Sequence, residues 1–336
     1  MKAIVIASAQ DLQIVDVPVP EPGPDQVLVR VRYVGICGSD LHYHVHGANG
    51  AFVIREPLIP GHEMSGTIEL DPQGEWAPGT TITLHPATFG PELPGMESIR
   101  HLRPGGSYLG SASTWPHTQG AMVEIMLVRR DMIRLLPERL PLQRAALTEP
   151  LSVALHALTM AGDLTGRSVL VIGAGPIGLL TAFAAQIRQA DSVAISDVLP
   201  QPLQRANRLG VHHTYQTGLQ DPPDNAFDVV LECTGVPAAI SSAVRAARPR
   251  GTVVQVGIIS AEPIPVVLAG LVSKELTLVG TFRFDDEIDE AIPILAAHPE
   301  VESVITQVMP ASQVESAFAI ARDCAASGKV LVEIGA

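Results

Sequence analysis

The sequence predicts a two-domain protein in which a parallel α/β sheet, covered on both faces by helices, follows a β-rich region. The chain has 336 residues, which is about twice the length of a typical single domain. Its character also changes near residue 150, from short strands punctuated by proline to apolar strands that alternate with helices. Such alternation is typical of a parallel sheet with helices on both faces.

The composition of the chain indicates a globular protein and argues against two classes of partner. Hydrophobic residues make up 46% of the chain and charged residues 17%, which suits a large buried core. The formal net charge of −13 argues against nucleic acid or an anionic membrane as the partner. Three scattered cysteines form no disulfide framework, which indicates a reducing, cytoplasmic compartment. The uncharged stretch 168–187 has the length of a membrane span, but its glycine motif favours a buried strand, turn and helix.

The β-rich region covers the first 150 residues or so. The N-terminal MKAIVIASA is apolar but short, and it lacks a basic segment, so we interpret it as an opening strand rather than a signal peptide. Apolar residues alternate with others over 27–33, which is the period of a half-buried strand. Proline-rich stretches such as VPVPEPGP suit short strands joined by loops.

The first stretch with distinctive chemistry is GICGSDLHYHVHG at 35–47, which PGHE follows at 60–63. Cys37 and His62 lie on different segments, so the fold must bring them together. A thiolate, an imidazole and a carboxylate form a donor set that suits zinc. One thiolate and one carboxylate neutralise Zn²⁺ and leave it a good Lewis acid. We therefore expect three protein ligands and an open fourth position, as in catalytic zinc sites.

The third ligand is either Glu63 or Glu149. Glu63 directly follows His62, and neighbouring residues on a regular strand point to opposite faces. Both can bind one metal only if the chain bends, which Gly61 would allow. Otherwise the ligand is Glu149, in the sequence TEP at the domain junction. The alternative without a metal is a buried cysteine beside a core histidine.

Period-two spacing of histidines after Cys37 raises the question of a second metal site. That spacing would place three imidazoles on one face of a strand. We instead interpret these residues as solvated loop histidines: His42, His44 and His46.

A dinucleotide site is predicted where the α/β region begins. The motif Gly173-Ala-Gly175-Pro-Ile-Gly178 closes a predicted strand and opens a predicted helix. Its glycines let the backbone approach a pyrophosphate, and the helix N-terminus supplies amides and partial positive charge. Asp197 ends the next strand, where a carboxylate binds ribose hydroxyls and repels a 2′-phosphate. NAD is therefore favoured over NADP. The alternative is a glycine turn needed only for packing.

Further apolar strands continue the sheet, and a short tail follows. The strands read SVAISD, DVVLECTG, GTVVQVG and LTLVGTF, with helical stretches between most of them. After about residue 286 the sequence predicts a helix, a strand, a second helix and a last strand, KVLVEI. This tail is too short to form a domain, so we expect it to pack onto an existing one.

Six motifs together resemble the zinc-dependent medium-chain alcohol dehydrogenases, most closely the polyol branch that contains sorbitol dehydrogenase and L-idonate 5-dehydrogenase. They are GICGSDLHY (35–43), PGHEMSG (60–66), TEPLSVALHA (148–157), GAGPIG (173–178), ECTG (232–235) and GTFRF (280–284). The resemblance implies a GroES-like catalytic domain over 1–150 and 287–336, split around a Rossmann NAD-binding domain over 151–286. The active site would lie between them.

The resemblance also implies roles for single residues. One catalytic zinc per chain would be held by Cys37, His62 and one of Glu63 or Glu149, with Asp40 supporting these ligands. Ser39 would take the alcohol proton and His42 would pass it to solvent, which suits a group with a pKa near the working pH. We expect the cofactor to contact Gly173, Gly175, Pro176, Ile177, Gly178, Asp197, Cys233 and Gly257. The substrate pocket would be lined by Glu149, Tyr43, Trp115, Arg283 and Phe284, although the three aromatic residues also fit core packing.

One segment departs from many bacterial members of the family, which carry four cysteines for a structural zinc. The corresponding stretch here, 85–107, has no cysteine, so we expect no structural zinc. Four apolar residues recur there at roughly helical spacing and predict that apolar packing replaces the metal: Leu93, Met96, Ile99 and Leu102.

The predicted function is the oxidation, with NAD, of a secondary alcohol in a polyol or sugar acid, because zinc lowers the pKa of an alcohol. The stretch GSASTWPHTQG (110–120) resembles the idonate branch more than the sorbitol branch, which favours an L-idonate 5-dehydrogenase-like enzyme over a sorbitol or xylitol dehydrogenase. Arg283 would hold either hydroxyl groups or the carboxylate of a sugar acid. The family suggests a homo-oligomer, either a tetramer or a dimer.

Two alternatives of other kinds are a zinc-free NADPH quinone reductase and a non-catalytic NAD-binding protein of the same fold. The donor set of Cys37 and His62, together with Asp197, argues against the first. Intact ligands and the pair Ser39 and His42 argue against the second.

Overall fold

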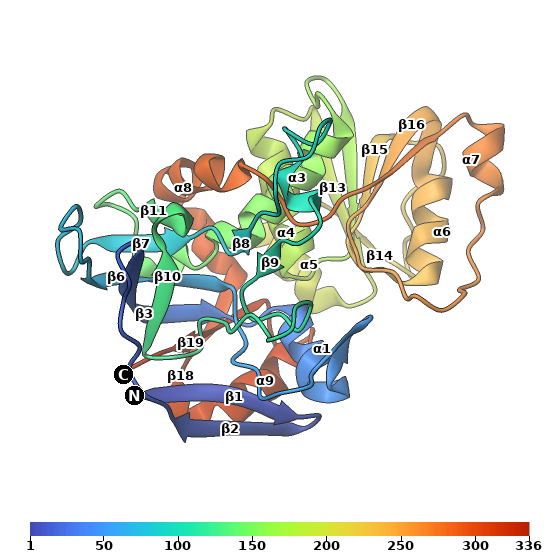
Figure 1. The fold of residues 1–336 in the computed structure, drawn as a ribbon. Coiled ribbons are helices and arrows are strands. Elements are labelled where there is room, and N and C mark those ends of the chain that lie inside the picture. Colours follow the sequence, from blue (N-terminus) through green and yellow to red (C-terminus); the bar gives the residue numbers. More distant parts are fainter. Residues whose placement is uncertain (336) are drawn as a thin grey trace.

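The computed structural model describes residues 1–335 and contains two large β-sheets with helices between and around them (Figure 1). The six-stranded sheet is parallel throughout and has the order β14-β13-β12-β15-β16-β17. In chain order its strands are β12 (Ser168–Ile172), β13 (Ser192–Asp197), β14 (His213–Gln216), β15 (Phe227–Glu232), β16 (Ala247–Gln255) and β17 (Thr277–Gly280). This is the 3-2-1-4-5-6 order of doubly wound sheets that bind dinucleotides. The predicted fold class is confirmed.

Alternate residues of this sheet enter two different cores, as expected for a sheet that is buried on both faces. On β12, Val169 and Val171 pack in the core that contains α3 (Thr148–Ala161), α4 (Pro176–Ile187) and α8 (Glu287–Ala297). Leu170 and Ile172 face the opposite core, which α6 (Pro237–Ala246) covers. Two further helices complete this part of the chain: α5 (Pro200–Arg208) and α7 (Ala269–Ser273).

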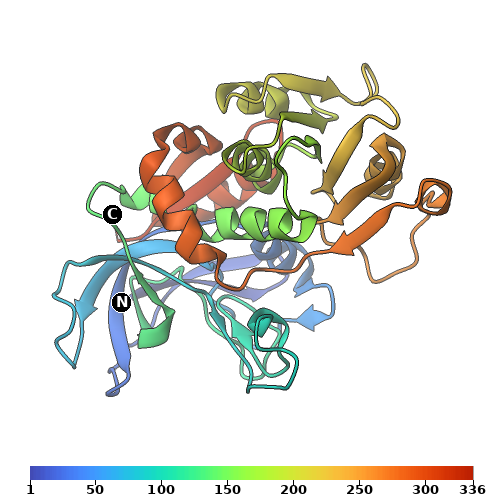
Figure 2. The same ribbon diagram turned by 90° about the horizontal axis from the view of Figure 1, so that it is seen from above.

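The seven-stranded sheet is mainly antiparallel and joins the two ends of the chain. Its path is β11-β7-β6-β3-β19-β18, and β10 also pairs with β3. The strands are β3 (Gln26–Gly35), β6 (Glu63–Leu70), β7 (Thr81–Leu84), β10 (Ile125–Arg129), β11 (Ile133–Leu135), β18 (Ile305–Pro310) and β19 (Lys329–Glu333). The C-terminal tail therefore adds two strands to a sheet made otherwise from the first 135 residues. Figure 2 shows this sheet below the helices that separate it from the parallel sheet.

Smaller elements surround this sheet. Three two-stranded pairs are present: β1 (Lys2–Ser8) with β2 (Asp11–Asp16), β4 (Ala48–Asn49) with β5 (Phe52–Val53), and β8 (Ala87–Thr88) with β9 (Ser107–Tyr108). Three more helices are α1 (Gly38–His46), α2 (Leu142–Ala145) and α9 (Val314–Arg322).

Two local expectations are wrong. The histidine-rich stretch is the helix α1 rather than a loop, so period-two spacing does not put its imidazoles on one face. His42 and His46 are four residues apart and their ring centroids lie 5.8 Å apart, whereas His44 packs edge-on against Phe318 of α9.

The second wrong expectation concerns the cysteine-free stretch 85–107. It contains one 3₁₀ turn (Arg100–Leu102) and no longer helix, and Ile99 and Leu102 are exposed. Polar contacts hold the stretch instead, because the guanidinium of Arg103 donates to the carbonyl oxygens of Met96 and Glu97 at 3.0 and 3.3 Å.

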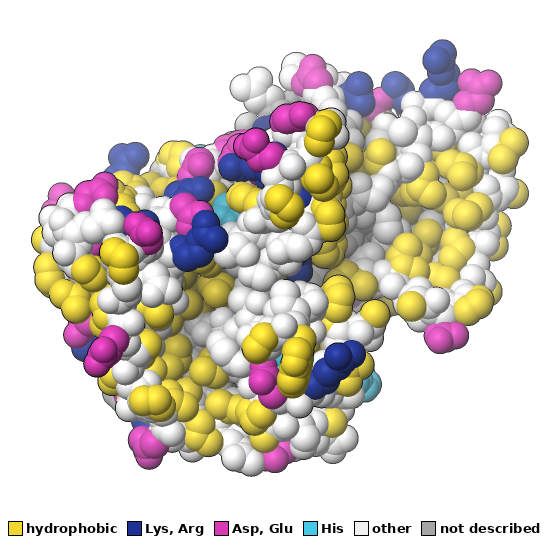
Figure 3. Space-filling model, viewed as in Figure 1, with side chains coloured by type: hydrophobic (Ala, Val, Ile, Leu, Met, Phe, Trp, Pro, Cys, Tyr) yellow, Lys and Arg dark blue, Asp and Glu magenta, His cyan; other side chains and the backbone are white. Residues whose placement is uncertain are grey.

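The surface matches the acidic composition, and charged side chains of both signs are scattered over it (Figure 3). On the face shown, hydrophobic side chains gather over the part that holds α6 and α7. Among residues 1–335, no helix is both long and apolar enough to cross a bilayer.

Candidate active site

The metal-binding segments are joined by one buried carboxylate. Cys37 is the residue that precedes α1, directly after β3, and Asp40 lies in the first turn of that helix. The carboxylate of Asp40 accepts hydrogen bonds from the amides of Cys37 at 2.9 Å and Gly61 at 3.1 Å. Asp40 is fully buried, and burial is the main cause that raises its pKa. Asp40 thus fixes the backbone on both sides of the candidate site.

Three candidate ligands converge. Donor atoms of Cys37, His62 and Glu63 all lie within 4.8 Å of one another. Two buried polar atoms of these residues, a ring nitrogen (Nδ1) of His62 and Oε2 of Glu63, have no hydrogen-bond partner within residues 1–335. Buried polar atoms are rarely left unpaired, so the group fits a cation with a mixed sulfur, nitrogen and oxygen shell, as zinc prefers.

The pKa of His62 shows that this histidine lies among acidic groups that also attract a cation. Burial lowers its pKa, but the thiolate of Cys37, aided by Asp40 and Glu149, raises the pKa to about 10. The folded protein therefore favours the protonated imidazole at neutral pH. A metal that binds here displaces that proton.

A bend explains how two adjacent residues reach one site. Gly61 has φ +95°, and a Cβ at this position would lie 2.6 Å from a side-chain carbon of Val34. Strand β6 begins only at Glu63, so His62 lies outside the regular ladder. The alternation of a strand does not apply between them, and Glu63 joins Cys37 and His62.

The other candidate carboxylate, Glu149, has a different partner. Glu149 lies in the first turn of α3, and its Oε1 accepts a hydrogen bond of 2.6 Å from the hydroxyl of Tyr108. Tyr108, which sequence reasoning missed, ends β9 and packs edge-on against the ring of His62. Burial, followed by the charge of Glu149, raises the pKa of Tyr108, which keeps its hydroxyl a proton donor.

A second missed residue is Lys329, the first residue of β19. It is 2% exposed, and its ammonium donates to Oε1 of Glu63 at 2.6 Å. Burial lowers the pKa of Lys329, but the charges of Glu63 and Cys37 act against burial and the net pKa is raised. The only sequence signal was a charged residue at the start of the apolar strand KVLVEI, which is not specific.

The predicted proton path lies on one helix. Ser39 and His42 are three residues apart on α1, so they share a face, and the ring of His42 is exposed. Tyr43, on the buried face, accepts a hydrogen bond from the amide of Ala112 at 3.0 Å.

The predicted substrate residues differ in their surroundings. Phe284 is 1% exposed and packs against the ring of His85, which fits the core-packing alternative. Trp115 is 61% exposed and contacts the ring of His117, so it does not lie in the core. Arg283 places its guanidinium 4.1 Å from the ring centroid of Tyr108.

The glycine motif is built as a cradle for an anion. Gly173 has φ +94°, and a Cβ on Gly178 would lie 1.8 Å from the carbonyl oxygen of Gly173, so helix α4 starts in contact with the turn. Gly175 precedes α4, its Cβ position meets open space, and no side chain caps the helix. Pro176 and Ile177 form the first turn, where uncapped amides suit a pyrophosphate.

The remaining cofactor candidates adjoin this cradle. The carboxylate of Asp197 accepts hydrogen bonds from the amides of Ala174 at 2.8 Å and Leu199 at 2.9 Å, so it lies against the glycine turn. The amide of Cys233 donates to the carbonyl of Ile172 at the end of β12. Gly257 contacts the loop after β15, where a Cβ would lie 2.1 Å from the nitrogen of Gly235. These residues thus lie at the carboxyl ends of β12, β13, β15 and β16, on both sides of the point where the strand order reverses.

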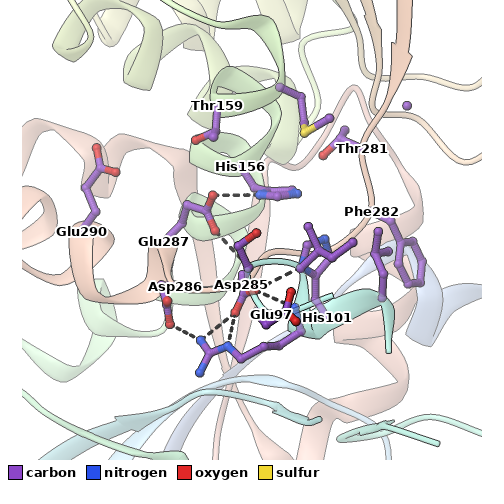
Figure 4. Close-up of a pocket in the computed structure, with 16 residues that line it drawn as sticks. Glu97, His101, His156, Thr159, Thr281, Phe282, Asp285, Asp286, Glu287 and Glu290 are labelled. Atoms are coloured by element: carbon purple, nitrogen blue, oxygen red, sulfur yellow. Dashed lines mark hydrogen bonds and ion pairs between the residues drawn. The ribbon is translucent and has the colours of Figure 1, made fainter. Parts of the chain in front are cut away.

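A cavity of about 710 Å³ is lined by residues other than the cofactor candidates described above (Figure 4). Its lining comes from 97–102, from the end of α3 and from 280–290. His156, Asp285 and Glu287 are joined by hydrogen bonds at its wall, while Phe282 contributes apolar surface.

Comparisons with known proteins agree with this geometry. Residues 23–138 match the family described as alcohol dehydrogenase GroES-like domain, and residues 176–297 match the family described as zinc-binding dehydrogenase. The chain is 32% identical to sorbitol dehydrogenase of Gallus gallus over 332 residues, which is 94% of this chain and 92% of the relative. It is 32% identical to sorbitol dehydrogenase of Bacillus subtilis over 308 residues, or 88% and 86% of the two chains.

A solved structure shares the arrangement of both sheets. L-idonate 5-dehydrogenase of Escherichia coli superposes with a TM-score of 0.91 at 28% identity, covering 99% of this chain and 97% of the other.

Proposed function

Because the chain belongs to the zinc-dependent medium-chain alcohol dehydrogenases, we propose that it transfers hydride from a secondary alcohol of a polyol or sugar acid to NAD. Zinc, when bound, supplies a Lewis acid that lowers the pKa of an alcohol, and NAD supplies the hydride acceptor. We propose that the substrate is a sugar acid, as for an L-idonate 5-dehydrogenase-like enzyme.

The protein's own groups would build the site. Cys37, His62 and Glu63 would hold the metal, and Asp40 keeps their two segments together through the amides of Cys37 and Gly61. Glu149 and Tyr108 form a buried, hydrogen-bonded pair beside His62, which would limit the access of water to this side of the site. Asp197 would bind the ribose hydroxyls of NAD from beside the glycine turn.

Proton transfer would use helix α1. Ser39 would accept the proton of the alcohol, and His42 would release it to solvent from the exposed end of the same helix face. An imidazole suits this step because its ordinary pKa lies close to neutral pH.

The observation that supports a sugar acid best is the state of Arg283. Its guanidinium lies over the ring of Tyr108, next to the carboxylate wall, and among residues 1–335 it forms no hydrogen bond or ion pair. Its φ is +55°, in the left-handed region that a non-glycine residue adopts rarely. A planar guanidinium in this state suits two parallel hydrogen bonds to a carboxylate.

A second candidate is a sorbitol or xylitol dehydrogenase. The relatives at 32% identity are named sorbitol dehydrogenases, and sorbitol carries no carboxylate. In that case Arg283 would contact hydroxyl groups instead.

The test is NADH formation by the purified protein with aldonates and with neutral polyols, combined with metal analysis. We expect about one zinc per chain, loss of turnover on chelation, and preference for an aldonate. Arg283→Gln should raise KM for the aldonate roughly 10- to 100-fold, which corresponds to a lost charge-assisted hydrogen-bond pair. The same change should affect neutral polyols little, and Arg283→Lys should recover part of the aldonate binding.

Equal losses for charged and neutral substrates in Arg283→Gln would contradict the sugar-acid assignment and favour the sorbitol-like alternative. Turnover with NAD that persists after complete zinc removal would contradict the proposed chemistry itself.

A further inference from the structure

Glu63 forms a buried ion pair with Lys329, a residue near the other end of the chain. Lys329 opens the strand β19, which pairs with the metal-bearing end of β3, and its side chain runs through the buried interior. Its ammonium donates to Oε1 of Glu63 at 2.6 Å and to the carbonyl oxygen of Ile36, directly before Cys37, at 3.1 Å. One cation therefore contacts both segments that carry the candidate metal ligands.

The two carboxylate oxygens of Glu63 have different surroundings. Oε1 is occupied by Lys329, and Oε2 is buried without a hydrogen-bond partner within residues 1–335. Gly35, opposite Glu63 in the β3–β6 ladder, leaves room for Oε2, since a Cβ there would lie 2.0 Å from that oxygen. The carboxylate is thus held in one orientation with one free oxygen.

Acidic groups surround the candidate metal site, and the ammonium of Lys329 lies among them. Cys37, Asp40, Glu63 and Glu149 place one thiol and three carboxyl groups close together, and the three carboxyl groups are buried. A carboxylate ligand added to a thiolate ligand donates charge to a metal and reduces its acidity. The ammonium of Lys329 withdraws charge from the same carboxylate, and its side chain is 3% exposed, so solvent screens it little.

We propose that Lys329 is a positioning residue of the metal centre. It holds Oε1 of Glu63 so that Oε2 alone is offered to the metal, and its charge offsets that of the carboxylate so that the metal stays a strong Lewis acid. This inference rests on the proposed function. It adds Lys329, in the strand β19, to the residues that support the metal ligands. Outer residues that orient ligands commonly change metal affinity 10- to 100-fold when they are replaced.

The experiment compares wild type with Lys329→Met, using zinc affinity from competition with a chromophoric chelator and the absorption spectrum of the Co²⁺-substituted protein. We expect Lys329→Met to bind zinc roughly 10- to 100-fold more weakly and to shift the Co²⁺ ligand-field bands. The matched control is Lys274→Met, which removes a partly buried lysine that donates to three backbone carbonyls beside α6. The control should change neither readout.

A double variant tests whether Lys329 acts through Glu63. Lys329→Met with Glu63→Gln removes both charges of the buried ion pair, so it avoids the unpaired carboxylate that Lys329→Met alone leaves in the interior. It should match Glu63→Gln alone in zinc affinity and spectrum, because the interaction has already been removed. A further loss in the double variant, or wild-type affinity and spectrum in Lys329→Met, would overturn the proposal. If wild type binds no zinc, or binds it as Cys37→Ser does, the proposed function fails instead.

Discussion

The carboxylate of Glu287 shows how strongly a single residue is bound into the wall of the cavity in Figure 4. Its Oε1 pairs with Nδ1 of His156 at 2.8 Å, and its Oε2 accepts the amide of Asp285 at 3.0 Å. Burial raises the pKa of Glu287, but the hydrogen bond and the charge of His156 lower it by more than burial raises it. The resulting pKa is about 2. His101 and Arg100 lie close to the same cluster. The folded state thus favours the ionised form.

This pKa predicts a stability that depends on pH. A pKa that is lower in the folded state stabilises the protein above the unfolded value of about 4.3, and the effect is lost as pH falls towards 2. Glu287→Gln should therefore reduce the free energy of unfolding by about 2–3 kcal/mol at pH 7. Urea unfolding from pH 7 to pH 3 should show the two proteins converging below about pH 4. A difference that stays constant over this range would mean that the ion pair is not its source.

Residue types could be predicted here more easily than their partners. Cys37 and His62 lie in motifs with recognisable chemistry, and the bend at Gly61 was foreseen as the condition for Glu63 to join them. Lys329 could not be predicted, because it reaches Glu63 across 266 positions of sequence and no local pattern marks such a pair. The hydroxyl of Tyr108 was missed for the same reason.

At the scale of elements, a buried carboxylate joins the loops that follow two neighbouring strands. Glu232 ends β15 and is fully buried, and it accepts hydrogen bonds from the amides of Thr234 and Gly235, both at 2.8 Å. The side-chain amide of Gln255, at the end of β16, donates to Glu232 at 2.5 Å and to the carbonyl of Gly257 at 2.8 Å. These loops adjoin the glycine turn, where a Cβ on Gly173 would touch the side chain of Thr234.

The pairing predicts that Glu232 and Gln255 shape the cofactor site together. Glu232→Gln turns an amide group towards donors that need an acceptor, so NADH affinity should fall about 10-fold. Exchange of both residues, Glu232→Gln with Gln255→Glu, restores a carboxylate–amide pair and should recover part of that loss. Fluorescence titration with NADH measures both variants without any need for turnover. Wild-type affinity in Glu232→Gln would show that these loops do not depend on the carboxylate.

Element types were predictable where the local pattern was strong. The strands and helices of the parallel sheet follow from apolar runs and glycine turns, but the strand β14 was not predicted because HTYQ has no apolar run. Helix α1 was missed since its sequence, GSDLHYHVH, alternates as a strand would. Its start is set by a hydrogen bond between Asp40 and the amide of Cys37, which periodicity does not reveal.

At the scale of the whole molecule, the cysteine-free stretch 85–107 is fastened to a distant segment. Arg100 donates from its amide and its guanidinium to the carboxylate of Asp285, at 2.8 and 2.7 Å, and also pairs with Asp286. His85 contacts the carbonyl oxygen of Asp285 at 2.8 Å. Charged and polar contacts therefore take the place of the apolar packing that the spacing of Ile99 and its neighbours suggested.

This fastening predicts how the stretch responds to mutation. Arg100→Gln should remove the guanidinium that pairs with Asp285 and Asp286, leaving Asp285 only its backbone donor in this stretch, and raise the rate of limited proteolysis within 85–107 about 10-fold. Arg129→Gln is the matched control, because it breaks an exposed ion pair with Asp131 that contributes little. Mass spectrometry of the fragments locates the cuts. Equal cleavage rates in both variants would show that Arg100 does not restrain this stretch.

The C-terminal strand β19 has a consequence for the order in which the protein is built. The parallel sheet comes from one continuous stretch, 168–280, so it can form while later residues are still being translated. The other sheet needs β19 against β3, and so it stays open until residue 333 has left the ribosome. Until then Cys37 and His62 lack the ammonium of Lys329 beside them, so the site can take up its metal in its final form only after the chain is almost fully translated.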